Sequence, residues 1–522
     1  MSPPPDGGYA GGNTAEGQNA LLSLTIGNYN TAVGFLSLRS NTDRQFNTAI
    51  GAGALLISNA DENTATGAAA LLSNINGVAN TANGAFALFS NTQGEHNTAT
   101  GASALFSNTE GVGNTALGDS ALFSNTEGFQ NTAIGDGALG SNTTADGNTA
   151  IGAATLAFNS TGSGNTAVGA GTLYLNTADG NTATGFEALF TNSTGANNTA
   201  DGRFTLASNT TGFDNTAVGS AALEDNDAEG NTAVGSRALT SNTTGNANTA
   251  VGLEALKANT DGLGNTAVGF DALSDNTTGV LNTAIGGAAL PGNITGSSNI
   301  ALGWNAGVNV STANNVICIG AGVTGQNVSD GCYIANIWNQ SGGSQAVYIN
   351  SDGKLGAQVS SRRFKDDIRP LGKASEALFK LKPVSFRYKP EVEPTRPLGF
   401  GLVAEEVERV SADLVTHDRE GKAYTVRYDQ VNAMLLNEFL KEHKRVEEQG
   451  VTIAALRLAV ARQRNDFEAI AAKQQEQIQA LAADIQKVSA QAEIITSVEG
   501  KHQYDGRIRH GRSGTRVALN NP

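Results

Sequence analysis

Residues 231–247 read Asn-Thr-Ala-Val-Gly-Ser-Arg-Ala-Leu-Thr-Ser-Asn-Thr-Thr-Gly-Asn-Ala, and Asn248 begins the same pattern again. The opening Asn-Thr-Ala-x-Gly occurs 17 times between Asn13 and Asn282, and a variant, Asn-Ile-Ala-Leu-Gly, begins at Asn299. Successive copies are 17 residues apart, except for three intervals of 16. A fixed period predicts a repeat architecture in which each unit is one turn of the chain.

One such unit is too short to bury enough apolar surface to offset its chain entropy, whereas stacked units bury Ala, Val and Leu against each other. The two Asn of each unit can stack into amide ladders, and the Gly at the fifth place permits a sharp turn. The repeat therefore predicts a mainly β fold, a parallel β-solenoid (β-roll) of about 18 rungs over residues 13–310, behind a short tail at 1–12. The Gly-x-x-Ala-Leu-x-x-Asn stretch is compatible with a single helical turn in each rung or with a strand.

Charge is distributed unevenly along the chain. Residues 1–300 hold 23 Asp and Glu against 5 Lys and Arg, whereas the remainder holds 25 acids and 28 bases. A dilute acidic surface repels nucleic acid, so we expect no nucleic-acid partner. Aromatic residues are only 6% of the chain, and Gly reaches 64 of 522 residues, which favours a structural protein over a large enzyme. No apolar run is long enough to predict a membrane span, and the start shows no secretory signal.

Several weak motifs predict no ligand site. Cys318 and Cys332 are too few for a disulfide scaffold and have no neighbouring His for zinc, so core positions are expected, with a disulfide as the minor alternative. The glycines of 320–325 match a dinucleotide fingerprint but precede a turn instead of a helix. The acidic run 224–229 lacks calcium-loop spacing and is interpreted as solvated. We therefore expect no metal and no cofactor.

The pattern N-T-A-V-G-x-x-A-L resembles the head repeats of trimeric autotransporter adhesins and the shafts of phage tail fibres. In those proteins three chains form one fibre. The resemblance implies a homotrimer located in a virion tail fibre or at a cell surface, and it allows a surface glycan or protein as receptor.

A junction at residues 311–359 follows the repeats. Turn residues there separate three short strand-like runs, which predicts antiparallel hairpins. The runs are Cys332–Trp338, Gln345–Asn350 and Lys354–Ala357.

The composition changes again at Ser360, where a charged segment without glycine begins. The pattern that follows predicts a small α+β domain over residues 360–445. Its expected elements are a helix at 373–381, a strand at 384–388, a helix at 404–410, a strand at 424–428 and a long helix that opens near Tyr428 with Asp429 as N-cap.

Three motifs of this domain carry a second resemblance. They are S-S-R-R-F-K-D-D-I at 360–368, L-G-F-G-L-V-A-E-E-V-E at 398–408 and Y-T-V-R-Y-D-Q-V-N-A-M-L-L at 424–436. Together they resemble the C-terminal intramolecular chaperone of phage endosialidases and tail spikes, a self-cleaving serine peptidase family. The resemblance implies Ser360 as nucleophile, Lys365 as base, cleavage between Val359 and Ser360, and Gly399 beside the site, where backbone approaches closely.

The implied chemistry is physically reasonable. A serine hydroxyl needs a neighbouring base, and a lysine amine can be that base only where desolvation disfavours its charged form. Spacing alone does not pair Ser360 with Lys365, because residues five apart share no face of a helix or strand. The family usually has Asp at the second place of the motif, and here Ser361 offers a rival nucleophile.

Residues 446–497 show a heptad pattern. Val446, Ile453, Val460 and Phe467 occupy a positions, and Leu456 and Ile470 occupy d positions. A shift of four residues near Gln474 is a stutter, after which Ile478, Leu481, Ile485 and Val488 carry the stripe. A homotrimeric coiled coil fits this pattern, and an amphipathic helix folded onto its own domain is the alternative. A basic tail at 498–522 follows.

The sequence thus predicts a trimeric, tail-fibre-like structural protein whose C-terminal domain drives trimerisation and then cuts the chain once, as an autocatalytic serine endopeptidase with a Ser-Lys dyad. The alternative is a cell-surface adhesin whose repeats bind a ligand and whose chaperone domain stays uncleaved. A hydrolytic head is not expected, because the repeats carry no paired acids, His or Arg at matching places.

Overall fold

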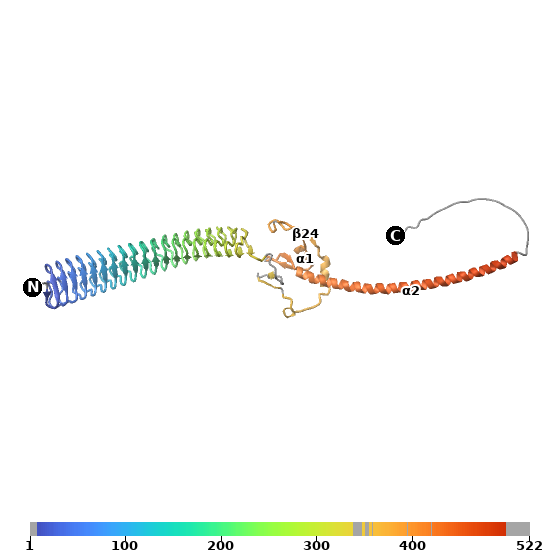
Figure 1. Cartoon of the computed structure of the whole chain (residues 1–522), viewed down its shortest axis with the longest axis horizontal. Helices are drawn as coiled ribbons and strands as arrows, with labels where there is room; N and C mark the ends of the chain where they lie inside the picture. The colour runs from blue at the N-terminus through green and yellow to red at the C-terminus, as the bar shows by residue number, and fades with distance from the viewer. Residues whose placement is uncertain are drawn as a thin grey trace. The chain divides into compact units, whose positions relative to one another are not determined.

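The computed structural model describes residues 8–337, 347–349, 354–357, 359–393, 395–418 and 420–496. The chain separates into two compact units, Met1–Ser344 and Gln345–Pro522. Figure 1 shows the regular coils of the first unit and the long helix α2 of the second. The predicted tail at 1–12 is described only from residue 8 onward. The predicted tail at 498–522, and the ends of two junction runs at Trp338, Gln345 and Asn350, lie outside the described residues.

The first unit is a parallel β-solenoid of about 19 turns, so the predicted fold is confirmed. Each rung contributes one short strand, and neighbouring strands pair in parallel without a shift: Thr232, Ala233 and Val234 lie opposite Thr249, Ala250 and Val251. Among the described strands of the solenoid, β1 (Gly8–Tyr9) alone pairs antiparallel, with β2 (Asn13–Glu16). The later strands are β3 (Thr31–Val33), β4 (Thr48–Ile50), β5 (Thr64–Thr66), β6 (Thr81–Asn83), β7 (Thr98–Thr100), β8 (Thr115–Leu117), β9 (Thr132–Ile134), β10 (Thr149–Ile151), β11 (Thr166–Val168), β12 (Thr182–Thr184), β13 (Thr199–Asp201), β14 (Thr216–Val218), β15 (Thr232–Val234), β16 (Thr249–Val251), β17 (Thr266–Val268), β18 (Thr283–Ile285), β19 (Ile300–Leu302), β20 (Ile317–Ile319) and β21 (Cys332–Ile334).

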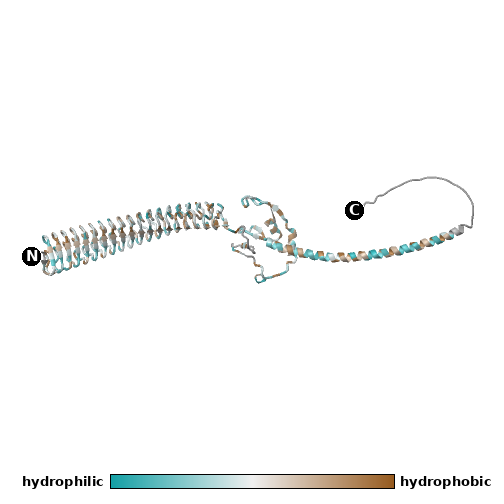
Figure 2. Ribbon diagram, viewed as in Figure 1, coloured by the Kyte–Doolittle hydropathy of each residue, from teal (hydrophilic) through white to brown (hydrophobic). Residues whose placement is uncertain are grey.

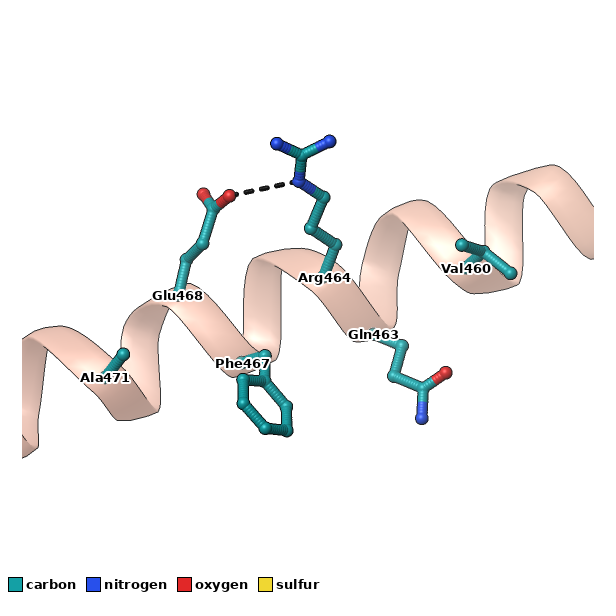
Figure 3. A pocket seen from close by; sticks show the side chains of 6 residues that line it. All are labelled: Val460, Gln463, Arg464, Phe467, Glu468 and Ala471. Atoms are coloured by element: carbon teal, nitrogen blue, oxygen red, sulfur yellow. Dashed lines mark hydrogen bonds and ion pairs between the residues drawn. The ribbon is translucent and has the colours of Figure 1, made fainter. Parts of the chain in front are cut away.

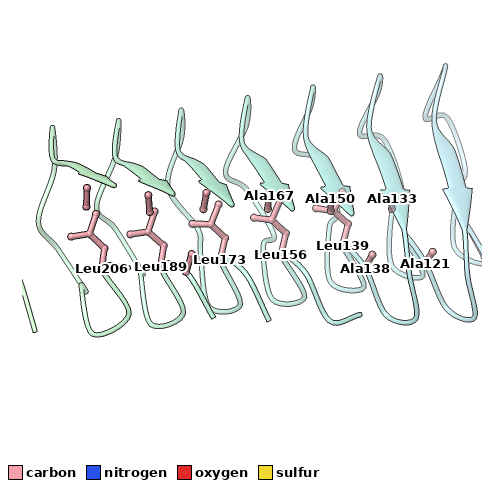
Figure 4. Packing of buried hydrophobic residues seen from close by; sticks show 14 of the residues in the cluster. Ala121, Ala133, Ala138, Leu139, Ala150, Leu156, Ala167, Leu173, Leu189 and Leu206 are labelled. Carbon is pink, nitrogen blue, oxygen red and sulfur yellow. The ribbon is translucent and has the colours of Figure 1, made fainter. Parts of the chain in front are cut away.

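The apolar part of the interior consists of three side chains in a typical rung. In the rung that starts at Asn231, Ala233 points inward from the strand, and Ala238 and Leu239 point inward from the following turns; all three are fully buried. Figure 4 shows how such Ala and Leu side chains form continuous columns along the solenoid. The expectation that the Val of each unit is also buried is wrong: Val234 is 38% exposed, because its neighbour Ala233 takes the inward direction and strand side chains alternate.

The stretch after the strand is neither helix nor strand but a succession of turns. In the same rung, Gly235, Arg237 and Leu239 all have positive φ, of 137°, 56° and 53°. A Cβ on Gly235 would lie 2.3 Å from the carbonyl oxygen of Gly252, so the predicted role of this glycine in a close turn is confirmed.

Two ladders of asparagine run along the solenoid, as the sequence predicted. The first ladder uses the Asn that opens each unit: the backbone N–H of Asn248 donates to Oδ1 of Asn231 at 2.9 Å. The same bond repeats at every step from Asn13 to Asn299, and the N–H of Val316 ends the series.

The second ladder uses the Asn at the twelfth place, where Nδ2 of Asn259 donates to Oδ1 of Asn242 at 2.7 Å. It runs from Asn74 to Asn293. In the rung before Asn74 the twelfth place holds Ser58, a buried residue whose hydroxyl has no hydrogen-bond partner. The second ladder therefore has a gap near its N-terminal end.

The junction differs in part from the prediction. The run at Cys332 is β21, which pairs parallel with β20, so its assignment to an antiparallel hairpin is wrong and the parallel sheet runs past residue 310. The other two runs form a hairpin of β22 (Val347–Ile349) and β23 (Leu355–Ala357), as predicted. Cys318 is buried, as expected, but Cys332 is exposed, and both are free thiols. Burial and the nearby Cys332 raise the pKa of Cys318.

The second unit contains the α+β domain and α2. Its elements after β23 are the 3-10 helices η1 (Arg362–Phe364), η2 (Ala374–Lys380) and η3 (Ala412–Leu414), the strands β24 (Val384–Phe386), β25 (Gly399–Gly401), β26 (Val415–His417) and β27 (Ala423–Val426), and the helices α1 (Ala404–Val410) and α2 (Tyr428–Thr496). The strands form two antiparallel pairs, β24 with β25 and β26 with β27.

A small core centred on Val407, Leu414, Val426 and Met434 joins α1, η3, β27 and the first turns of α2. The predicted helix 404–410 is observed as α1, whereas the predicted helix 373–381 is the 3-10 helix η2. Because α2 already begins at Tyr428, Asp429 lies in its first turn and is not the N-cap that was predicted.

Candidate functional site around Ser360 and Lys365

The chain around Ser360 folds into one tight turn between extended residues. Ser361 is extended (φ −63°, ψ 143°), η1 supplies a single 3-10 turn, and Lys365 is extended again (φ −130°, ψ 129°). This turn brings Nζ of Lys365 to 3.0 Å from Oγ of Ser360, with the ammonium donating. The two residues that the family resemblance implies as nucleophile and base are thus hydrogen-bonded within one chain.

Both side chains of this pair are exposed to solvent, and so are Val359 and Ser361. The hydroxyl of Ser361 makes no hydrogen bond to Lys365 within the described part of the chain. A lysine serves as a base only where burial disfavours its charged form. A single chain therefore provides the proximity that the reaction needs but not the desolvation.

Gly399 lies in β25, and the ring of Phe386 on the paired strand β24 packs against it. A Cβ at this position would come within 3.0 Å of the Phe386 ring, so a larger residue would require the ring to shift. Across the described residues, no hydrogen bond joins Gly399 to Ser360 or Lys365. The implied role of Gly399 beside the reacting groups therefore stays a prediction.

Tyr428 makes a contact between β25 and α2 that sequence reasoning did not identify. Its hydroxyl, on the first turn of α2, accepts a hydrogen bond from the backbone N–H of Leu402 at 3.0 Å. A Cβ on Gly401 would lie 2.8 Å from the same hydroxyl, so glycine leaves room for it. The contact fixes the end of β25 to the start of the long helix. The sequence signal was the second glycine of the 398–408 motif.

A second serine and lysine meet between η2 and α2. The buried hydroxyl of Ser375 donates to Oε1 of Glu438 at 2.5 Å, and Nζ of Lys441 lies 3.3 Å from it. Lys441 also donates to Glu438 at 2.6 Å, and this bond, with that from Ser375, lowers the pKa of the Glu438 carboxyl. A neighbouring carboxylate favours the charged form of an amine. We therefore assign the Ser375 cluster to holding η2 against α2 and not to nucleophilic chemistry.

One side chain of the acidic run 224–229, that of Asp227, binds the backbone of a neighbouring turn. One oxygen of Asp227 accepts hydrogen bonds from the backbone N–H groups of Thr210, Thr211 and Gly212 in the preceding rung.

Over the described residues, no group of three or more His, Cys, Asp or Glu side chains could hold a metal ion. None of the helices in that part of the chain combines the length and the apolar character needed to cross a membrane.

The apolar stripe of α2 is uncovered. From Val446 to Val488, the side chains predicted at the heptad positions are all at least half exposed, so this part of α2 is not folded onto its own domain. Figure 2 shows apolar and polar residues alternating along the helix. In Figure 3, Arg464 and Glu468 point toward each other, with Nε and Oε1 3.2 Å apart, while Phe467 projects from another side of the helix.

Residues 360–416 match the model of a peptidase family described as chaperone of endosialidase. No curated protein and no solved structure matches the chain. The matched segment begins at Ser360 and includes η1, η2, α1 and the paired strands β24 and β25. Behind the β-solenoid, the chain therefore carries a C-terminal segment, residues 360–416, that is similar to the chaperone-of-endosialidase family, whose members are self-cleaving intramolecular chaperones.

Proposed function

We propose that this protein is a trimeric, tail-fibre-like structural protein that acts outside the cell, on a virion tail or a cell surface. Its C-terminal domain assembles three chains and then cuts each chain once, between Val359 and Ser360. The observation that carries the proposal is the 3.0 Å contact between Lys365 and Ser360, at the first residue of the segment that matches the self-cleaving family.

Exposure of the pair and exposure of α2 support a link between assembly and cleavage. The stripe from Val446 to Val488 is apolar along one side and uncovered, and heptad stripes of this kind bury themselves against copies of the same helix. Assembly of α2 brings three chaperone domains together. In the proposed trimer, the neighbouring domains cover Lys365 and supply the desolvation that one chain lacks.

The proposed reaction begins with attack of Ser360 Oγ on the carbonyl carbon of Val359, while Lys365 takes the hydroxyl proton. The new C–O bond forms as the peptide C–N bond breaks, and the amide nitrogen of Ser360 receives a proton and becomes a free amine. Water then hydrolyses the resulting ester, so that the products are a carboxylate on Val359 and the restored serine hydroxyl. No cofactor takes part in the proposed sequence.

Mass spectrometry of the purified full-length protein tests the proposal. We expect the wild type to yield a shaft that ends at Val359 and a released piece of 163 residues, since the chain has 522. Ser360→Ala should leave one chain, because a methyl group cannot attack. Release of the same fragment from Ser360→Ala would refute the assignment and point to Ser361 or to another protease.

Two further variants test whether Lys365 acts as a base or only through its positive charge. Lys365→Ala should abolish cleavage, and Lys365→Arg should abolish it too, because guanidinium keeps its protons in proteins. Ser361→Ala is the matched control at the neighbouring hydroxyl and should cleave like the wild type. If Lys365→Arg still cleaves, Lys365 is not the base.

The adhesin alternative is not favoured. The best candidates for stacking on a sugar are the exposed aromatic side chains of the solenoid, but Phe89, Phe106 and Phe123 stack on each other at centroid distances of 5.0 and 5.1 Å. Both faces of the Phe106 ring are therefore covered by neighbouring rungs, whereas Phe270 and Trp304, outside this stack, are 54% and 65% exposed.

A further inference from the structure

The outward side of the solenoid sheet consists of two rows of side chains. The second place of each unit forms a threonine row, from Thr14 to Thr283, which continues as Ile300. The fourth place forms an aliphatic row, in which 12 of the 18 residues from Glu16 to Leu302 are Val, Ile or Leu. We call the two rows together the strand face. Because the strands pair in register from β2 to β20, the strand face repeats without interruption along the solenoid.

Charge is nearly absent from the strand face. Of its 36 side chains, only Glu16 and Asp201 are charged, although residues 13–300 contain 22 Asp and Glu and 5 Lys and Arg. The remaining charged residues stand at the turns. Two solenoids of this negative charge repel each other except along a surface from which charge is excluded. The strand face is that surface.

Hydrogen bonding also distinguishes the strand face from the turns. At the turns, the hydroxyl of Thr243 donates to the carbonyl oxygen of Thr260 in the next rung, and Thr260 does the same to Thr277. On the strand face, the hydroxyls of Thr232 and Thr249 make no hydrogen bond within the described chain. The turn threonines thus bond within one solenoid, whereas the hydroxyls of the threonine row are open to bonds with water or with another molecule.

We propose that the strand face is the contact surface between the solenoids of neighbouring copies of this chain. The inference rests on the proposed trimer and names the surface through which its solenoids meet. A face 18 rungs long, at about 4.8 Å per rung, and two side chains wide presents on the order of 800 Å². In the trimer this area is divided between two neighbours, so each chain buries in total about the area that one partner buries in a standard stable interface. A second copy also has the same rung spacing, so contacts made at one rung recur at all the others.

The two rows differ, which fixes how three copies meet. Around a three-fold axis each chain contacts its two neighbours through different sides of one surface, because such contacts are heterologous and close into a ring. The threonine row of one chain then lies along the aliphatic row of the next. In this arrangement Thr232 of one copy lies opposite Val234 of its neighbour, at the same height along the axis.

Cysteine cross-linking of the full-length protein tests the arrangement. In a Cys332→Ser background, which removes the exposed native thiol, the double variant Thr232→Cys with Val234→Cys should oxidise to a covalent trimer on denaturing electrophoresis. Each single variant should reach a covalent dimer at most, since one thiol per chain cannot close a ring. The control, Ser241→Cys with Thr243→Cys, has the same spacing at a turn of the same rung and should stay monomeric on the gel.

Light scattering before denaturation separates this inference from the proposed function. A trimer in solution with no covalent trimer from the strand-face pair overturns the strand face as contact surface and leaves the trimer proposal standing. A monomer in solution overturns both. If the turn pair gives covalent trimers as readily as the strand-face pair, the cross-links arise from random encounters of chains and not from a defined contact surface. That result would also overturn the inference.

Discussion

The leucine at the ninth place of each unit combines a strained backbone with complete burial. All 17 such leucines from Leu21 to Leu290 have φ between 47° and 54°, a region that costs an L-residue about 1–2 kcal/mol. Burying the side chain returns about 1.5–3 kcal/mol. The next rung has Gly307 at this place, with φ of 76°. Burial therefore offsets the strain wherever the rung interior must be filled.

We therefore expect the free energy of unfolding to depend strongly on which leucine of a rung is substituted. Leu256→Asp should lower the free energy of unfolding by several kcal/mol, because it places an unpaired charge in the interior. Leu253→Asp in the same rung should change it by less than about 0.5 kcal/mol, since Leu253 is 44% exposed. Thermal unfolding of the two variants checks the result, and equal shifts would contradict the packing.

The gap in the second ladder predicts a stabilising substitution. Ser58→Asn should place an amide between Asn41 and Asn74 and remove an unpartnered buried hydroxyl, raising stability by about 1 kcal/mol. The rung of Ser58 is one of the three with 16 residues, and the other two hold Asn176 and Asn226 at this place without difficulty. The reverse change, Asn226→Ser, is the matched control and should lower the melting temperature. A lower melting temperature for Ser58→Asn would refute the assignment.

Asp227 predicts a pH-dependent contribution to stability. Partial burial acts to raise the pKa of this carboxyl, but hydrogen bonds from Thr211, Thr210 and Gly212 outweigh it and lower the pKa. A lowered pKa in the folded state means that the stabilisation is present above the ordinary Asp value and is lost as the pH falls through the folded value.

The Asp227→Asn variant isolates this effect, because an amide oxygen accepts the same bonds in a later rung, where Asn327 faces the N–H groups of Ser311, Thr312 and Ala313. We expect the wild type to melt above the variant at pH 7 and the difference to shrink below about pH 4. A difference that stays constant from pH 7 to pH 2.5 would exclude the charge as its cause.

At the level of elements, the sequence predicted what periodicity controls. The spacing of Asn, Ala and Leu was sufficient for the solenoid, its inward Ala and Leu, and both amide ladders. Periodicity did not reveal that Val234 faces outward, because a three-residue strand has room for one inward side chain. Helix propensity of Ala and Leu suggested a helical turn after each strand, but the left-handed residues Arg237 and Leu239 exclude one.

The candidate site was predictable only through resemblance to the family. No simple element brings residues five apart together, and the 3.0 Å contact of Ser360 and Lys365 depends on a single 3-10 turn between extended residues. Tyr428 and Ser375 are positioned by contacts across 26 and 63 residues of sequence. A glycine such as Gly401 can indicate a close approach but does not identify the distant partner, so sequence reasoning missed these contacts.

The helix α2 yields a prediction that joins assembly and cleavage. Val460→Asp should give a monomer that does not cleave, because a charge at a heptad a position opposes packing of the apolar stripe. Asn465→Asp adds the same charge five residues on, at an f position that faces solvent in a coiled coil, and should assemble and cleave normally. Sedimentation equilibrium and mass spectrometry provide the two readouts. Complete cleavage of a monomeric Val460→Asp variant would show that cleavage does not require assembly.

In the whole molecule, register must be fixed at two levels: between the rungs of one chain, and between neighbouring chains. Within one chain, ladders and parallel pairing align the rungs, and the 16-residue units interrupt an otherwise uniform repeat. Between chains, the solenoid offers a strand face whose two rows repeat from rung to rung, on which copies could slide by whole rungs. A C-terminal domain that aligns three chains at one end would remove this ambiguity, and after that it is no longer needed.

Cleavage in the assembled protein should then follow the kinetics of a unimolecular reaction. Above the concentration at which trimers are complete, the rate constant should not change when the protein is diluted tenfold, because Ser360 and Lys365 belong to one assembly. Quenched samples analysed by mass spectrometry measure this. A rate that rises in proportion to concentration would indicate cleavage by a separate molecule.

The two asparagine ladders also give the solenoid a direction. In the ladder bonds of both, the later rung donates and the earlier rung accepts, as in Asn248 to Asn231 and Asn259 to Asn242. The amide dipoles therefore add along the axis, in the way that peptide dipoles add along a helix. Two solenoids joined head to head would set donor against donor or acceptor against acceptor at the joint. End-to-end growth of such rods, whether by evolution through added repeats or by engineering, is consequently restricted to head-to-tail order.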